Sequence, residues 1–299
     1  MVKWNNRRFL EILVKGVKQP RDIPHYVRKK LRDVKKIVKA IKCRIKSESE
    51  FDIVEKYCMF IGHGRTGHSL VGSLLNAHPE IVISHELDVL KFINYPLPVR
   101  RNTLFQMILC KDRNFNNKER EWNRYEYDIP YKWQGRFDKM RIIGDKKGGK
   151  SSSILKGNTK LMSELKNVVK IPIRIIHVVR NPFDVLASRY KLTGSWDPYL
   201  DRFFRRAESV NEISKILKDC ELCRIYYEDL INNPKRVMSG LIKFLGVKEE
   251  KKYLSVCSEF IFDSPKQTRY NVEWPNEKVK KIELFKKKYE WLSGYKFND

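Results

Sequence analysis

The chain has 299 residues, enough for one large domain or one domain with appendages. Lysine and arginine number 62 against 36 aspartates and glutamates, and the resulting net charge of +26 makes acidic ligands or partners the expectation. No apolar run approaches the ~18 residues that cross a bilayer, and charges near the N-terminus interrupt any signal-peptide core, so we expect a cytoplasmic protein without a membrane span.

Residues 1–50 are strongly basic and are predicted to form a helical N-terminal extension to a catalytic domain over residues 51–299. Apolar side chains recur at helical spacing over Phe9–Val17 and again over Val34–Ile41. The favoured interpretation is a helix that packs on the catalytic domain and exposes its lysines. The alternative is peripheral contact with an anionic membrane or with nucleic acid.

The stretch Tyr57–Glu86 organises the rest of the chain. Its apolar run Tyr57–Ile61 predicts a strand, and three glycines follow within Gly62–Gly67. Helical spacing over Leu70–Leu75 and a second apolar run at Ile81–Ile83 complete half of a doubly wound unit. In such a unit, backbone N–H groups of the loop and the helix N-terminus can hold a phosphate.

Strands and helices alternate through the remainder of the chain. The segment 86–130 is less regular and is expected to form helices and loops over the carboxyl edge of the sheet. A basic glycine loop is predicted at Gly144–Lys150. Further strands are predicted at 141–143, 173–179 and 222–227, and helices at 158–169, from 182, at 198–218, 234–246, 249–257 and 277–292. The pattern predicts an α/β fold, with three layers (α/β/α) around a central parallel sheet.

The loop Gly62–Ser69 reads G-x-x-x-x-G-H-S, the phosphate-loop pattern with His68 in place of lysine. A triphosphate-using enzyme needs that lysine and a magnesium-binding aspartate at a strand end. Here the histidine should be neutral at pH 7, and the clearest strand ends at Arg180. Arg65 can supply the fixed charge instead. Ser69 can either cap the helix or donate to a phosphate oxygen.

Arg180 and Ser188 indicate a second anion site. The arginine leaves a strand end, and the serine lies two turns along the helix that begins near Pro182. Two phosphate sites at adjacent strand ends fit a nucleotide that is phosphorylated at both its 5′ and 3′ positions. The Cys220–Cys223 pair lacks a second pair at metal-ligand spacing and is interpreted as ordinary thiols, so no metal site is expected.

Four segments, in this order, resemble the sulfotransferases that use 3′-phosphoadenylyl sulfate (PAPS). GRTGHSLVGSLLNAHPEI resembles their 5′-phosphosulfate loop, and RIIHVVRNPFDVLASRYK resembles their 3′-phosphate motif. RIYYEDLINNPKRVMSGLIKFLGV is similar to the strand and helix that follow, and SPKQTRYNVEW to the C-terminal cofactor segment. The resemblance is closest to the carbohydrate and bacterial types. It implies a sulfotransferase fold related to that of phosphate-loop NTPases, with PAPS as cofactor, adenosine 3′,5′-bisphosphate (PAP) as product and no metal.

The resemblance also implies roles for individual residues. Those matching the loop around the phosphosulfate are Arg65, Thr66, Gly67, His68 and Ser69. Those matching the ligands of the 3′-phosphate and the C-terminal basic segment are Arg180, Ser188, Lys266 and Arg269. Glu86 falls where glycan sulfotransferases carry an acidic general base, and Lys146 falls near the lysine that those enzymes use close to the transferred sulfuryl group. His85 is the rival base, and only one of the two should face the cleft because neighbours on a strand point to opposite faces.

Three alternative functions follow from these observations. The first is metal-independent, in-line transfer of a sulfuryl group to a hydroxyl or amine acceptor such as a carbohydrate, and the positive charge favours an anionic glycan. The second is a phosphate-loop kinase for a small molecule or nucleotide. The third is a non-catalytic protein that binds nucleic acid or an anionic surface. No recognisable RNA-binding pattern of interleaved aromatic and basic residues is present, so a nucleic-acid partner is not expected.

Overall fold

The computed structural model describes residues 25–44, 51–93, 95, 99–117, 120–122, 125–218 and 221–299. Its centre is a five-stranded sheet in the order β2-β5-β1-β6-β7, with every neighbouring pair parallel. The strands are β1 (Lys56–Gly62), β2 (Ile81–His85), β5 (Ile142–Lys146), β6 (Ile173–Val179) and β7 (Leu222–Tyr226). A short antiparallel pair joins β3 (Glu121–Trp122) to β4 (Tyr125–Glu126).

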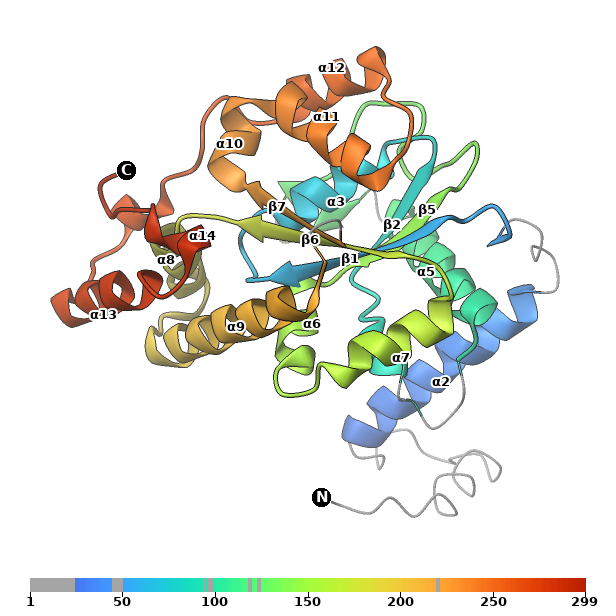
Figure 1. The fold of residues 1–299 in the computed structure, drawn as a ribbon, viewed down its shortest axis with the longest axis horizontal. Coiled ribbons are helices and arrows are strands. Elements are labelled where there is room, and N and C mark those ends of the chain that lie inside the picture. Colours follow the sequence, from blue (N-terminus) through green and yellow to red (C-terminus); the bar gives the residue numbers. More distant parts are fainter. Residues whose placement is uncertain are drawn as a thin grey trace.

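Helices cover both faces of the sheet and make the three layers that the sequence predicts (Figure 1). One face carries α3 (His68–Asn76), α10 (Tyr227–Asn232), α11 (Pro234–Leu245) and α12 (Lys251–Phe260). The other carries α2 (His25–Arg44), α5 (Arg101–Asn116), α6 (Gly148–Leu155), α7 (Lys160–Val169) and α9 (Asp197–Ile216). The remaining elements are α4 (Leu90–Ile93), α8 (Pro182–Thr193), the 3₁₀ turn η4 (Thr268–Asn271), α13 (Asn276–Lys286) and α14 (Glu290–Ser293).

Strand β1 shows why both faces must be covered. Its alternate residues Tyr57, Met59 and Ile61 join the apolar core on the α2–α9 side, while Cys58 and Phe60 join the core on the α3–α12 side. All five side chains are almost completely buried. A strand that is apolar on both sides belongs in the middle of a parallel sheet, and it places the loop that follows it at the centre of the sheet's carboxyl edge.

The predicted strands are confirmed, whereas two predicted segments are wrong. Gly144–Lys150 is not a loop, because β5 continues to Lys146 and α6 begins at Gly148. The single helix predicted over 277–292 is two helices, α13 and α14, interrupted at 287–289. Between 86 and 130, where helices and loops are predicted, the helix α5 packs into the core of one face rather than lying over the sheet edge.

The described part of the predicted N-terminal extension, α2, packs on α5 as the favoured interpretation expects. Val34 and Ile37 are buried, but Val38 and Ile41 of the predicted apolar stripe are exposed, so the buried face is narrower than predicted. The exposed face carries a row of basic residues: Lys29, Arg32, Lys35, Lys36, Lys39 and Lys42. The predicted helix Phe9–Val17 lies outside the described residues.

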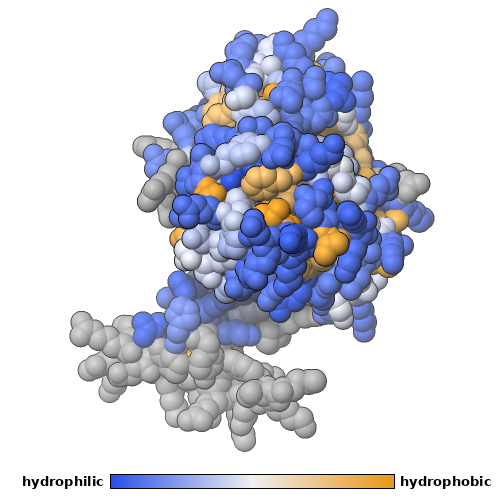
Figure 2. All heavy atoms as spheres, turned by 90° about the vertical axis from the view of Figure 1, so that its left-hand side faces the viewer, coloured by the Kyte–Doolittle hydropathy of each residue, from blue (hydrophilic) through white to orange (hydrophobic). Residues whose placement is uncertain are grey.

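The strands point toward the end of the molecule that holds α8 and α14 (Figure 1). Seen from that end, the surface is mostly hydrophilic, with hydrophobic residues in small separate groups (Figure 2). In the part of the chain that the structure describes, no helix combines the length and apolar character that a membrane span requires.

Candidate active site

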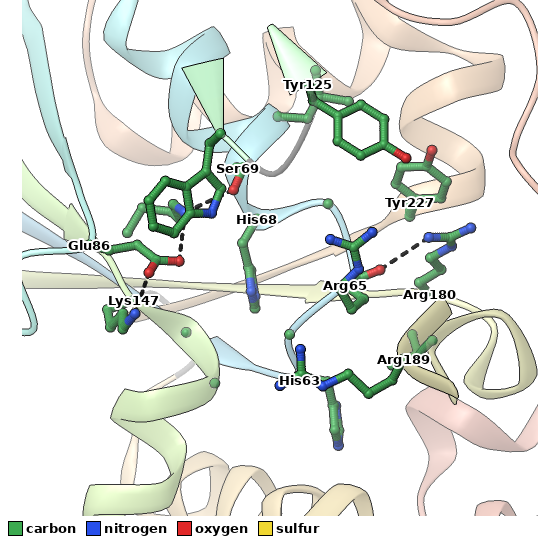
Figure 3. Close-up of a pocket in the computed structure, with 18 of the residues that line it drawn as sticks. His63, Arg65, His68, Ser69, Glu86, Tyr125, Lys147, Arg180, Arg189 and Tyr227 are labelled. Atoms are coloured by element: carbon green, nitrogen blue, oxygen red, sulfur yellow. Dashed lines mark hydrogen bonds and ion pairs between the residues drawn. The ribbon is translucent and has the colours of Figure 1, made fainter. Parts of the chain in front are cut away.

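A cavity of about 740 Å³ opens where β1, β2, β5 and β6 end. It is lined by the glycine loop after β1, by Glu86 after β2, by Lys146–Lys150 and by Arg180 after β6. Figure 3 shows Glu86 and Lys147 at one side of this cavity, Arg180 and Tyr227 at the other, and Arg65 between them. The carboxyl edge of a parallel sheet therefore brings the predicted donor and base residues into one space.

Backbone conformation fixes the shape of the glycine loop. Gly62 and Gly67 have φ angles of 119° and 99°, in the region that only glycine occupies without strain. A Cβ on Gly67 would also lie 2.8 Å from the ring of Tyr227. Thr66 is buried and its Oγ1 donates to the carbonyl of His63 at 2.9 Å, so its side chain closes the loop and does not line the cavity. The cofactor contact predicted for Thr66 stays a prediction, and it would have to come from the backbone rather than from this side chain.

His68 joins the loop to helix α6. Its Nε2 lies 3.0 Å from the carbonyl oxygen of Ile61, and because a carbonyl only accepts, this nitrogen carries the proton. Burial lowers the pKa of His68 to about 3, so the ring is neutral at pH 7. The ring packs so closely beneath Gly148 that a Cβ there would lie 2.4 Å from its Cε1. His68 is thus a packing element at the cavity floor.

Gly148→Ala is expected to lower the free energy of unfolding by about 1–3 kcal/mol, because the added methyl group overpacks a buried, hydrogen-bonded ring. Gly240→Ala in α11 is the matched control, since a Cβ there meets nothing within 4 Å. Urea denaturation of the two variants measures the difference. Equal stability would show that His68 does not constrain this position.

Lys146 and Glu86 form the polar centre of the cavity. Lys146 is 3% exposed, and its Nζ lies 2.8 Å from Ser69 Oγ and 3.2 Å from Glu86 Oε1. The other carboxylate oxygen of Glu86 accepts from Lys147. Ser69 is therefore not a helix cap, because Gly67 holds that position and the Ser69 hydroxyl faces Lys146.

The electrostatics of this centre follow from its burial. Burial lowers the pKa of Lys146 to about 8, although Glu86 opposes the shift. Burial alone would raise the pKa of Glu86, but Lys146 and Lys147 outweigh it and hold that pKa below its ordinary value. At pH 7 the site therefore contains a protonated lysine beside an ionised carboxylate.

His85 and Glu86 do not simply alternate as strand neighbours. Strand β2 ends at His85, and Glu86 takes a left-handed backbone conformation with φ 63°. Glu86 lines the cavity, whereas His85 is buried, stacks on Phe115 at 4.0 Å between ring centroids and places its Nε2 3.3 Å from Lys146 Nζ. Burial, and then the nearby lysines, lower the pKa of His85 to about 2. A ring in this position accepts from Lys146 and has no direct access to the cavity.

Asp145 holds the turn that carries Glu86. Its carboxylate accepts from the Ser84 hydroxyl and from the backbone N–H groups of Leu87 and Asp88, each at 2.8 Å, and from Val89 at 3.3 Å. Asp145 stands at a strand end beside β1 but is buried and does not line the cavity. Its oxygens are committed to these donors rather than to a ligand in the cavity. Within the described residues, no group of three or more His, Cys, Asp or Glu side chains is arranged to hold a metal ion.

At the opposite end of the cavity, Arg180 connects the glycine loop to the C-terminal segment. Its guanidinium donates to the carbonyl of Arg65 at 3.1 Å and to the carbonyl of Lys266, and it lies 4.6 Å from the centroid of the Tyr227 ring. Ser188 accepts from Arg65 Nε at 2.9 Å, which links α8 to the glycine loop. Lys266 lines the cavity, with its Nζ over the ring of Tyr125 at 4.9 Å.

Arg269, which is predicted to bind the cofactor, directs its side chain into a buried ion pair rather than into the cavity. Arg269 is 2% exposed and does not line this cavity. Its Nη1 lies 2.6 Å from Asp184 Oδ2, and its Nε donates to the carbonyl of Phe297. A buried arginine needs a carboxylate partner, and Asp184 of α8 is that partner. The Arg269 side chain therefore links the C-terminal segment to α8.

Sequence reasoning missed several basic residues of the cavity. Lys147 contacts Glu86, and three arginines on α8 and α9 line one wall: Arg189, Arg202 and Arg206. A signal for the α9 residues was present, because Tyr199, Arg202 and Arg206 recur at helical spacing and so share one face. Arg189 had no such signal, since only the tertiary fold brings α8 beside that face.

Comparison with known proteins identifies the family to which this chain is similar. A model of the sulfotransferase family matches residues 59–251, more than half of the chain. Mouse (Mus musculus) sulfotransferase 1A1 is 29% identical over 90 residues, a match that covers 25% of this chain and 31% of the mouse protein. The chain thus matches about a third of that relative's length.

Solved structures are also similar to this chain. The sulfotransferase STF1 from Mycobacterium tuberculosis H37Rv has a TM-score of 0.48 at 13% identity, covering 97% of this chain and 92% of that one. The sulfotransferase domain from the Synechococcus PCC 7002 olefin synthase has a TM-score of 0.46 at 15% identity, covering 75% of this chain and 82% of that domain.

Proposed function

Because the chain belongs to the sulfotransferase family, we propose that it transfers a sulfuryl group from PAPS to a hydroxyl or amine of an acceptor. The family match spans the first three of the four sequence segments and confirms the resemblance to the family there; the C-terminal segment 264–274 lies outside the match. The observation that carries the proposal is a single cavity that joins the glycine loop, Arg180 and the Lys146–Glu86 pair.

The residues present fit PAPS and its product PAP. The Nε of Arg180 is buried without a hydrogen-bond partner, so this guanidinium keeps a donor for an anion. Arg65 and Lys266 add positive charge along the same cavity. Aromatic rings suited to stacking on a purine lie at this end: Tyr125, Tyr227, Phe260 and Phe262. We infer that Arg180 holds the 3′-phosphate and that Arg65 and Ser69 hold the phosphosulfate. Ser188 supports the 3′-phosphate site indirectly, because it accepts a hydrogen bond from Arg65.

In this proposal PAPS supplies the sulfuryl group, and the protein supplies a base and fixed positive charge. Glu86 is ionised and lines the cavity, so it can accept the proton of the acceptor hydroxyl or amine. Protonated Lys146, held by Ser69 and Glu86, stabilises negative charge that develops during transfer. Lys147 donates to the other oxygen of the Glu86 carboxylate and so holds that side chain in position.

Calorimetry separates this proposal from a kinase. PAP is expected to bind in the presence of EDTA, and more tightly than ATP with magnesium. Asp145 supports this expectation, because the aspartate at the strand end is occupied by the turn 84–89. Preference for magnesium-ATP, or failure of PAP to bind, would overturn the proposal.

Arg180→Ala is expected to weaken PAP binding by at least ~10-fold, since a charged hydrogen bond contributes ~1.5–3 kcal/mol. Adenosine 5′-phosphate, which lacks the 3′-phosphate, is the control ligand, and its affinity should change much less. Titration of both ligands into wild type and variant gives the comparison. Equal losses for the two ligands would remove the 3′-phosphate assignment.

A further inference from the structure

Three arginines form one wall of the cavity, and the proposed donor site does not use them. Arg202 and Arg206 come from α9 and Arg189 comes from α8. Tyr199 lies between two of them, with the guanidinium carbons of Arg189 and Arg202 at 4.6 and 5.1 Å from its ring centroid. The tyrosine ring therefore holds two like charges close together. We call Arg189, Arg202 and Arg206 the arginine wall.

The arginine wall lacks acidic partners inside the protein. Across the described residues, none of its three members forms an ion pair with a carboxylate, and the Nε of Arg206 donates only to the Ser153 hydroxyl, at 3.0 Å. By contrast, the buried Arg269 is paired with Asp184. Like charges gathered without a counter-charge repel one another, and a bound anion would relieve that repulsion.

The arginine wall also borders the reacting centre. A Cβ on Gly149 would lie 3.1 Å from Arg206 Nη1, so this guanidinium packs on the first turn of α6, directly after Lys146 and Lys147. Figure 3 shows Arg189 on the His63 side of the glycine loop, away from Tyr125 at the nucleotide end of the cavity. An anionic group bound by Arg206 would thus lie beside the first turn of α6, next to the two lysines that contact Glu86, and on the other side of the glycine loop from Tyr125.

We propose that the arginine wall binds an anionic group of the acceptor, so that the enzyme sulfates a molecule that already carries a carboxylate, sulfate or phosphate. The inference rests on the proposed function, because it takes Glu86 as the acceptor's base. Two of the arginines lie four residues apart on one helix face and the third faces them across Tyr199, an arrangement suited to the several oxygens of such a group.

The titration behaviour of the cavity supports this placement. Burial, and then the charges of Arg202 and Arg189, lower the pKa of Arg206 to about 10. After burial, Lys146 and Arg206 both lower the pKa of His68 while Glu86 raises it, so these charged groups surround one imidazole.

Equilibrium dialysis with radiolabelled inorganic sulfate tests the inference. The protein is first saturated with PAP, and ionic strength is held constant with sodium chloride. Wild type is expected to bind sulfate, and Arg202→Gln/Arg206→Gln to bind it at least ~10-fold more weakly while keeping its affinity for PAP. The matched control is Arg205→Gln/Lys215→Gln, which removes the same charge from exposed positions of α9 outside the cavity and should behave as wild type.

Each outcome has a separate meaning. Absence of sulfate binding in wild type, or the same sulfate affinity in the arginine-wall and control variants, would overturn the inference. A matching loss of PAP affinity in the arginine-wall variant would also overturn it, because the arginines would then serve the donor. If wild type fails to bind PAP, the proposed function fails, and sulfate dialysis of the PAP-free protein still tests the arginine wall by the same comparison of variants.

Discussion

Replacing Glu86 by glutamine is expected to slow sulfuryl transfer by ~10²–10⁴-fold, the usual contribution of a positioned general base. The amide keeps the size of the side chain and can still accept a hydrogen bond from Lys146, but it cannot take a proton from the acceptor. Binding of PAP should not weaken, because Glu86 contacts lysines rather than the nucleotide end of the cavity. PAP release from PAPS, measured with the acceptor that wild type uses fastest in a panel of sugars, phenols and amines, gives the rate.

Glu126→Gln is the control for this experiment. Glu126 also lines the cavity, on β4, but is exposed and makes no ion pair among the described residues, so its variant should keep full turnover. Wild-type turnover in Glu86→Gln together with a large loss in His85→Ala would move the base to His85. The stacking of His85 on Phe115 and its position next to Lys146 argue against that outcome.

Lys146→Met is expected to reduce the rate by ~10²–10³-fold, the scale seen when one preorganised charge stabiliser is removed. The wild-type enzyme should also lose activity as the pH rises through about 8. The sign follows from the pKa of Lys146, which burial lowers to about 8: the amine is charged below that pH and neutral above it. A profile of kcat/KM against pH reports this group in the free enzyme.

Lys146→Arg separates the charge of this side chain from its titration. Arginine stays protonated, so residual activity in this variant should not fall near pH 8. Lys150→Met, at another cavity-lining lysine, should leave both the rate and the alkaline limb in place. An unchanged alkaline limb in Lys146→Arg would assign the transition to a different group.

The sequence predicts the parts of the site that depend on local patterns. Gly62–Gly67 is recognisable because a strand, closely spaced glycines and a helix follow one another along the chain. Arg180 is recognisable because it ends an apolar strand. In each case the signal lies within a few residues, and the parallel sheet then brings the strand ends together.

Contacts between distant segments could not be predicted in this way. Nothing near Arg269 reveals that its side chain pairs with Asp184, 85 residues earlier in the chain, so the sequence predicts a cofactor contact and not the buried ion pair. The rule that side chains of strand neighbours point to opposite faces does not apply to Glu86, because β2 ends at His85 and the backbone of Glu86 is left-handed. Arg189 joins Arg202 only through the packing of α8 beside α9, which no spacing along the sequence encodes.

The bonds made by Asp145 have a consequence for protein engineering. Three consecutive residues, Asp145–Lys147, hold both the turn 84–89 and the side chain of Glu86. The Asp145 carboxylate accepts from the backbone of the turn, and Lys146 and Lys147 donate to the Glu86 carboxylate. The distance between the proposed base, Glu86, and the proposed charge stabiliser, Lys146, is therefore set at a single strand end, and substitutions there would disturb both together. Attempts to retarget the enzyme to other acceptors should leave this run intact and diversify the exposed face of α9 around Arg202, where a side chain can change without moving the reacting groups.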